Sequence, residues 1–197
     1  MEIGEQQASA SVNTPLKKPT ILVVDDTPDN LELMNELLAD SYQLKIANSG
    51  ARALVLASTG VVPDLVLLDI MMPGMDGYEV CRQLKSNPVT REIPVVFLTA
   101  KIGVADEEKG LTIGAVDYLS KPISPPILQA RIKIHLALKQ QADFLRDKAA
   151  FLSQEVEKRT REVVAIQDVT IMAMASLAET RDSDTGNHIL RTQHYVK

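Results

Sequence analysis

A short apolar run that ends abruptly in one carboxylate constrains the fold more than any other feature of this sequence. The run is Leu65–Leu68, Asp69 follows it directly, and a loop rich in proline and glycine comes next. A continuous apolar run of this length is typical of a strand buried on both faces. An acid at its end would lie at the carboxyl edge of a parallel sheet, where open α/β folds bind ligands. On this stretch alone, Asp69 is as readily explained as a turn acid or a helix N-cap.

Four further segments resemble strands, and helical patterns separate them. The five predicted strands are Ile21–Val24, Gln43–Ala47, Leu65–Leu68, Pro94–Leu98 and Ala115–Leu119. Predicted helices begin after the N-cap Thr27, after the N-cap Ser49 and near Gly77. A weaker helix is predicted from about Asp106 to Thr112. This alternation predicts an α/β fold with a flavodoxin-like five-stranded parallel sheet that helices cover on both faces.

Side chains that can bind metal or take part in catalysis follow four of these strands. Asp25 and Asp26 follow the first strand, Asp69 the third, Thr99 the fourth and Lys121 the fifth. Because the strands are predicted to be parallel, all five side chains should converge on one edge of the sheet. Crowded carboxylates repel one another unless a cation compensates, and Mg2+ prefers oxygen ligands and bridges to phosphate. The alternative is three solvated loop acids and a surface lysine.

The same five side chains could carry out phosphoryl transfer. Asp69 could act as a nucleophile toward a phosphoryl group and form an aspartyl phosphate. Lys121 would supply a positive charge for one phosphoryl oxygen, and the Thr99 hydroxyl could donate a hydrogen bond to another.

Residues 20–136 resemble a receiver domain of a two-component response regulator. The resemblance rests on four motifs, which are Val24-Asp25-Asp26, Leu68 through Gly77, Leu98-Thr99-Ala100 and Ser120-Lys121-Pro122. It implies that Asp69 accepts a phosphoryl group from a histidine kinase. It also implies that Asp25, Asp26 and Asp69 bind Mg2+ together with the backbone carbonyl of Met71.

The receiver resemblance further implies a switch residue and an unusual peptide bond. Tyr118 matches the aromatic residue whose side-chain rotamer couples to Thr99, and the Lys121–Pro122 bond would be cis. Tyr118 could instead be an ordinary amphipathic residue of an edge strand.

A long uninterrupted helix is predicted beyond the receiver-like segment, because no glycine or proline occurs between Pro126 and Leu177. Apolar residues recur there at alternating steps of four and three, with Arg159 filling one position, and they are Leu138, Ala142, Leu145, Ala149, Leu152, Val156, Val163 and Ile166. Leucine at one core position with β-branched residues at the other favours a parallel two-stranded coiled coil. We therefore expect residues 137–175 to form a homodimeric signalling helix, in which Arg159 lowers stability and either fixes the register or permits rearrangement. The alternative is a helix packed on its own domain.

The end of the chain, residues 176–197, resembles the beginning of an HD-GYP domain, a metal-dependent phosphodiesterase acting on cyclic di-GMP. The matching segments are Ala178–Asp182, Thr185–His188 and Arg191–Gln193. The resemblance implies that Asp184 and His188 are the first two ligands of a transition-metal site. That site is incomplete here because the sequence contains no His-Asp dyad and no Gly-Tyr-Pro loop. We expect this chain to be a fragment without phosphodiesterase activity; on the residues alone, Asp184 and His188 could also be a turn acid and a surface histidine.

Composition excludes several classes of partner. The chain has 197 residues, a formal net charge of -5 at pH 7, and no basic cluster with interleaved aromatics, which argues against nucleic-acid binding. No apolar run approaches the roughly 18–20 residues that span a bilayer. Residues 1–19 lack an apolar signal core and are predicted to be a disordered tail, so we expect a cytoplasmic protein with no membrane partner. The single cysteine, Cys81, is expected to be an inert, half-buried thiol.

These motifs together predict a phosphorylation-dependent response regulator in two-component signal transduction. A dimeric coiled coil would relay the state of the receiver to an HD-GYP output. The alternative is a stand-alone receiver and coiled-coil adaptor that binds a partner protein. A third reading, in which the chain itself is a metal phosphodiesterase, needs ligands that the sequence lacks.

Overall fold

A five-stranded parallel sheet forms the centre of the fold in the computed structural model, which describes residues 18–100, 110 and 112–179. The strands lie in the order β2-β1-β3-β4-β5, as predicted for a flavodoxin-like sheet. Their bounds are β1 Thr20–Val24, β2 Gln43–Ala47, β3 Leu65–Asp69, β4 Val95–Thr99 and β5 Asp117–Ser120. Every residue of β1, β3 and β4 is buried, which explains why these strands are continuous apolar runs in the sequence.

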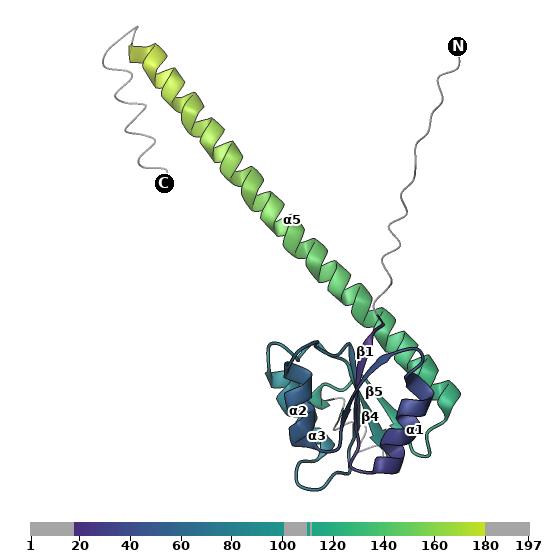
Figure 1. Ribbon diagram of the computed structural model, residues 1–197. Coiled ribbons are helices and arrows are strands. Elements are labelled where there is room, and N and C mark those ends of the chain that lie inside the picture. Colours follow the sequence, from purple (N-terminus) through teal and green to yellow (C-terminus); the bar gives the residue numbers. More distant parts are fainter. Residues whose placement is uncertain (1–17, 101–109, 111, 180–197) are drawn as a thin grey trace, which may run out of the picture. The chain divides into compact units, whose positions relative to one another are not determined.

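Helices cover both faces of the sheet (Figure 1). Their bounds are α1 Pro28–Leu38, α2 Gly50–Ser58, α3 Gly77–Ser86 and α5 Pro125–Glu179. On one face α2 and α3 pack on the sheet, and on the other α1 packs together with the first turns of α5. The crossovers place the carboxyl ends of all five strands at one edge.

The helix starts follow the predicted caps, with one difference. The Ser49 hydroxyl accepts a hydrogen bond from the Arg52 N–H at 3.4 Å and caps α2 as expected. Thr27 occupies the N-cap position of α1 before Pro28, but its side chain makes no cap hydrogen bond. Its backbone N–H donates instead to Asp25 Oδ1 at 2.9 Å, which ties the start of α1 to the carboxylate that follows β1.

The weaker helix predicted near residues 106–112 lies almost entirely outside the described residues. Gly110 and Thr112 are helical where the structure does describe this segment. Residues 1–17 of the tail predicted at residues 1–19, and the segment from residue 180 onward, also lie outside the described residues.

The chain divides into two compact units, Met1–Gln140 and Gln141–Lys197, with the boundary inside α5. In the first unit, α5 contributes Leu128, Ile132 and Leu136 to the buried core. In the second unit, the α5 side chains at the predicted coil positions are exposed, with Leu145 at 57%, Leu152 at 51% and Val156 at 64%. Within the described part of the chain, none of the helices is both long and apolar enough to cross a membrane.

Candidate functional site

The candidate site forms where the sheet order brings the ends of β1, β3, β4 and β5 together. Val24 pairs with Leu68, so Asp25 follows β1 beside Asp69, the last residue of β3. Thr99 ends β4 and pairs with Ser120 of β5, directly before Lys121. The structure therefore brings the five predicted residues to one edge.

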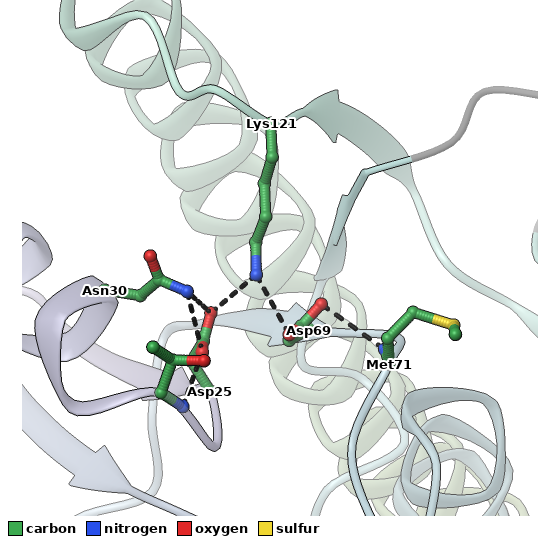
Figure 2. Close-up of polar contacts among 6 residues, drawn as sticks. Asp25, Asn30, Asp69, Met71 and Lys121 are labelled. Carbon is green, nitrogen blue, oxygen red and sulfur yellow. Dashed lines mark hydrogen bonds and ion pairs between the residues drawn. The ribbon is translucent and has the colours of Figure 1, made fainter.

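Lys121 links the two buried carboxylates of the site (Figure 2). Its Nζ lies 2.7 Å from Asp25 Oδ2 and 2.9 Å from Asp69 Oδ2. Asp25 is 1% exposed and Asp69 5%. Burial alone lowers the pKa of Lys121, but the hydrogen bonds and charges of the two carboxylates outweigh burial, and the net pKa of Lys121 is raised.

Asn30 holds the carboxylate of Asp25 from the first turn of α1 (Figure 2). Its side-chain amide nitrogen lies 3.0 Å from both Asp25 oxygens, and the Thr27 N–H donates to Oδ1 as well. The sequence analysis missed Asn30. Its position in the first turn of a helix that begins just after Asp25 is a signal that could have identified Asn30 as a partner of this carboxylate.

Asp69 is positioned by the loop that follows β3. The Met71 N–H donates to Asp69 Oδ1 at 3.4 Å, and the Met71 side chain is exposed. A Cβ at Gly77 would overlap the Asp69 carbonyl oxygen and lie 2.8 Å from the Ile70 Cα. Only glycine lets the start of α3 approach the end of β3 this closely. The predicted role of the Met71 carbonyl in binding metal stays a prediction.

The three carboxylates form an oxygen-rich cluster that fits a divalent cation. One ligand oxygen from each of Asp25, Asp26 and Asp69 lies within 4.8 Å of the other two. Three carboxylates face one ammonium group, that of Lys121, so negative charge is in excess at this edge. Mg2+ suits such a donor set because it prefers oxygen ligands and keeps several waters.

Thr99 and Tyr118 lie on neighbouring strands, β4 and β5. Thr99 is buried, and by strand alternation it lies on the same face of β4 as Phe97. The Tyr118 ring packs against Phe97 at a centroid distance of 5.3 Å. Tyr118 is thus on the edge strand but turned onto the core, and its predicted coupling to Thr99 stays a prediction. The Lys121–Pro122 bond is cis, as the resemblance implies.

Cys81 is not one of the residues that converge on this edge. Cys81 is fully buried in α3 rather than half-buried. Burial raises the pKa of Cys81 to about 11, although the neighbouring Lys85 charge lowers it, so the thiol is un-ionised at neutral pH. Asp184 and His188 lie outside the described residues.

A parallel sheet in this order, with acids after β1 and β3 and a lysine after β5, defines a class of signalling domain. Residues 21–133 match the family described as the response regulator receiver domain. The match spans more than half of the chain, and the chain belongs to this family.

Its relatives include longer regulators. A protein of Vibrio cholerae serotype O1, named as a probable cyclic di-GMP phosphodiesterase, is 51% identical over 182 residues, which make up 92% of this chain and 41% of the relative. The cyclic di-GMP phosphodiesterase response regulator RpfG of Xanthomonas campestris pv. campestris is 34% identical over 180 residues, 88% of this chain and 47% of the relative. The chain spans less than half the length of both.

The fold also matches solved receiver domains. The signal receiver domain of an HD domain-containing protein from Pseudomonas fluorescens Pf-5 superposes with a TM-score of 0.59 and is 26% identical. The match covers 64% of this chain and 99% of that domain.

Proposed function

We propose that this chain is a phosphorylation-controlled switch in which Asp69 accepts a phosphoryl group from a histidine kinase. The observation that carries the proposal is the shared contact of Lys121 with Asp25 and Asp69 at the carboxyl edge of the sheet. Asp69 is the last residue of β3, so a phosphoryl donor would approach it from the carboxyl edge of the sheet.

The transfer is a displacement at phosphorus. One oxygen of the Asp69 carboxylate attacks, the new P–O bond forms, and the bond from phosphorus to the donor breaks, with its electron pair leaving on the donor. Lys121 already lies 2.9 Å from Asp69 and would neutralise charge on the transferred oxygens, while Thr99 would donate a hydrogen bond. Asp25, Asp26 and Asp69 would hold Mg2+, which supplies further charge neutralisation when bound.

Acetyl phosphate with Mg2+ tests this chemistry directly. We expect the intact protein to gain the mass of one phosphoryl group, and Asp69→Asn to gain none. Asp76→Asn is the matched control, because Asp76 lies in the same loop but caps α3 by accepting from the Glu79 N–H. Phosphorylation that persists in Asp69→Asn would show that another residue is the acceptor.

We further propose that residues 137–175 of α5 pair with a second copy of the chain. The apolar positions at steps of four and three are exposed in the single chain, and they fit the seam of a parallel two-stranded coil. Arg159 falls in this seam, and its guanidinium pairs with Glu155 and Glu162 of its own helix, each at 3.1 Å. The charge in the seam is therefore compensated before association.

Light scattering on the full chain tests the association. The expected mass is twice the 21.6 kDa of one chain, with and without Mg2+ and a phosphoryl donor. A monomer under both conditions would exclude the coil.

We propose finally that the state of the receiver is relayed to an output that hydrolyses cyclic di-GMP. The names of the two longer relatives support this output, as does the HD-GYP resemblance at residues 176–197. Since the sequence holds only two of the metal ligands of that domain, the purified chain should leave cyclic di-GMP intact. Turnover that is lost in His188→Ala would contradict this.

A further inference from the structure

The aromatic side chains under β4 and β5 leave little room around Tyr118. The ring of Phe97 lies between two tyrosines, at a centroid distance of 5.2 Å from Tyr78 and 5.3 Å from Tyr118. Phe97 is fully buried and Tyr78 is 7% exposed, so neither ring can move aside without repacking the core.

Gly110 also lines the space that Tyr118 fills. It is buried. A Cβ built on Gly110 would overlap the Tyr118 hydroxyl oxygen and lie 2.6 Å from Tyr118 Cζ and 3.0 Å from Phe97 Cε2. The phenol end of Tyr118 thus occupies the volume that any side chain at position 110 would need.

We infer that Gly110 is a positioning residue for Tyr118, and that the missing side chain at position 110 makes the inward placement of the tyrosine possible. An alanine there excludes this placement and drives the ring outward. The steric relation stands on the contacts alone. Its consequence for switching rests on the proposed function, because it matters only if Tyr118 couples to Thr99 when Asp69 is phosphorylated.

A double-mutant cycle between Gly110→Ala and Tyr118→Ala tests the steric relation. In the parent, Gly110→Ala should lower the urea midpoint of unfolding because the new methyl group displaces the tyrosine. In the Tyr118→Ala background the same change should leave the midpoint unchanged or raise it, because alanine favours a helix over glycine. Equal shifts in both backgrounds would overturn the inference. If Gly110→Ala does not fold, recovery of folding in the double variant supports the inference, and failure of both overturns it.

Two further measurements distinguish the steric relation from the switch. The ring resonances of Tyr118, in protein labelled on tyrosine, should lose the ring-current shift from Phe97 in Gly110→Ala. An unchanged spectrum would overturn the inference. The response of these resonances to acetyl phosphate with Mg2+ should then disappear in Gly110→Ala while Asp69 still gains its phosphoryl group. If the ring is displaced in Gly110→Ala but the Tyr118 resonances of the parent do not respond to acetyl phosphate, the steric inference stands. The switching role of Tyr118 is then refuted.

Discussion

Asp25 and Asp69 are tolerated in a buried position because they share one ammonium group. Buried carboxylates without partners would take up protons or destabilise the fold. Lys121 contacts both, and Asn30 adds two donor contacts to Asp25. The third acid, Asp26, is more exposed than the other two, and it adds a further oxygen ligand for a cation.

The contribution of Lys121 should depend on pH in the alkaline range. Its folded-state pKa is raised above the value of 10.5 for a free lysine. Its charged form therefore stabilises the fold fully below about pH 10.5, and this contribution is lost as the pH rises through the folded-state pKa. In the presence of a chelator, Lys121→Met should lower the free energy of unfolding at pH 7 by about 1–3 kcal/mol. Urea titrations from pH 7 to 12 should show a constant difference from the parent up to about pH 10.5 and a narrowing difference above it. Lys133→Met, at an exposed position of α5, is the control. A difference in the free energy of unfolding between Lys121→Met and the parent that stays constant above about pH 10.5 would contradict this account.

Asn30 should matter for metal binding although it is not a predicted ligand. Its amide orients the Asp25 carboxylate, and partners that orient metal ligands typically change affinity by 10–100-fold when removed. We expect Asn30→Ala to weaken Mg2+ binding about tenfold, measured by calorimetric titration at constant ionic strength. Asn35→Ala, on an exposed position of the same helix, should bind Mg2+ as the parent does. Equal affinities in all three proteins would mean that Asp25 needs no such support.

At the residue scale, the sequence predicted the residues that converge at the site and missed those that position them. Asp25, Asp69 and Lys121 follow strands, so their convergence could be deduced from strand order alone. Asn30 and Gly110 act through a side-chain contact and through the absence of a side chain, on elements next to their targets in the sequence. The spacing places both residues near their targets, but it does not show which side chains touch.

At the scale of elements, the buried strands and the helix starts were predicted closely, and the edge strand β5 less closely. β1, β3 and β4 are buried on both faces, so an apolar run marks each of them, and the predicted ranges agree with the observed ones within a residue or so. β5 was predicted from Ala115 but begins at Asp117, and the Ala115 N–H donates to the Gly110 carbonyl rather than to β4. Thr27 marked the start of α1, yet its side chain makes no cap hydrogen bond, and its backbone N–H donates to the Asp25 carboxylate.

The seam of α5 gives a prediction about pairing and direction. Leu152 lies in the predicted seam, and Gln154 lies on the opposite side of the helix at an exposed position. In a parallel, in-register coil, identical seam positions face each other closely enough for a disulfide, which needs Cα atoms within about 7 Å. Leu152→Cys should form a covalent dimer under mild oxidation, and Gln154→Cys should not, as read on non-reducing gels. The native Cys81 is buried and should not interfere. Failure of Leu152→Cys in a chain of dimeric mass would indicate an antiparallel or shifted pairing.

At the scale of the whole molecule, one helix serves both the receiver and the proposed coil. The first turns of α5 place Leu128 and Ile132 in the receiver core, and no glycine or proline follows up to Glu179. Glycine and proline are common sites of kinks in helices. We therefore expect a change in the receiver to alter the packing of the seam rather than to be absorbed at a bend.

Insertions after Ala142 test this transmission, with the Leu152→Cys cross-linking rate as the reporter. In the parent, acetyl phosphate with Mg2+ should change the rate, and Asp69→Asn should abolish the change. Inserting seven residues keeps the heptad phase and should preserve the response. Inserting four shifts the phase and locally unwinds the supercoil, so the rate should no longer respond. Because both insertions lengthen the helix, length alone cannot explain a difference between them. A four-residue variant that responds as fully as the parent would rule out rigid transmission along α5.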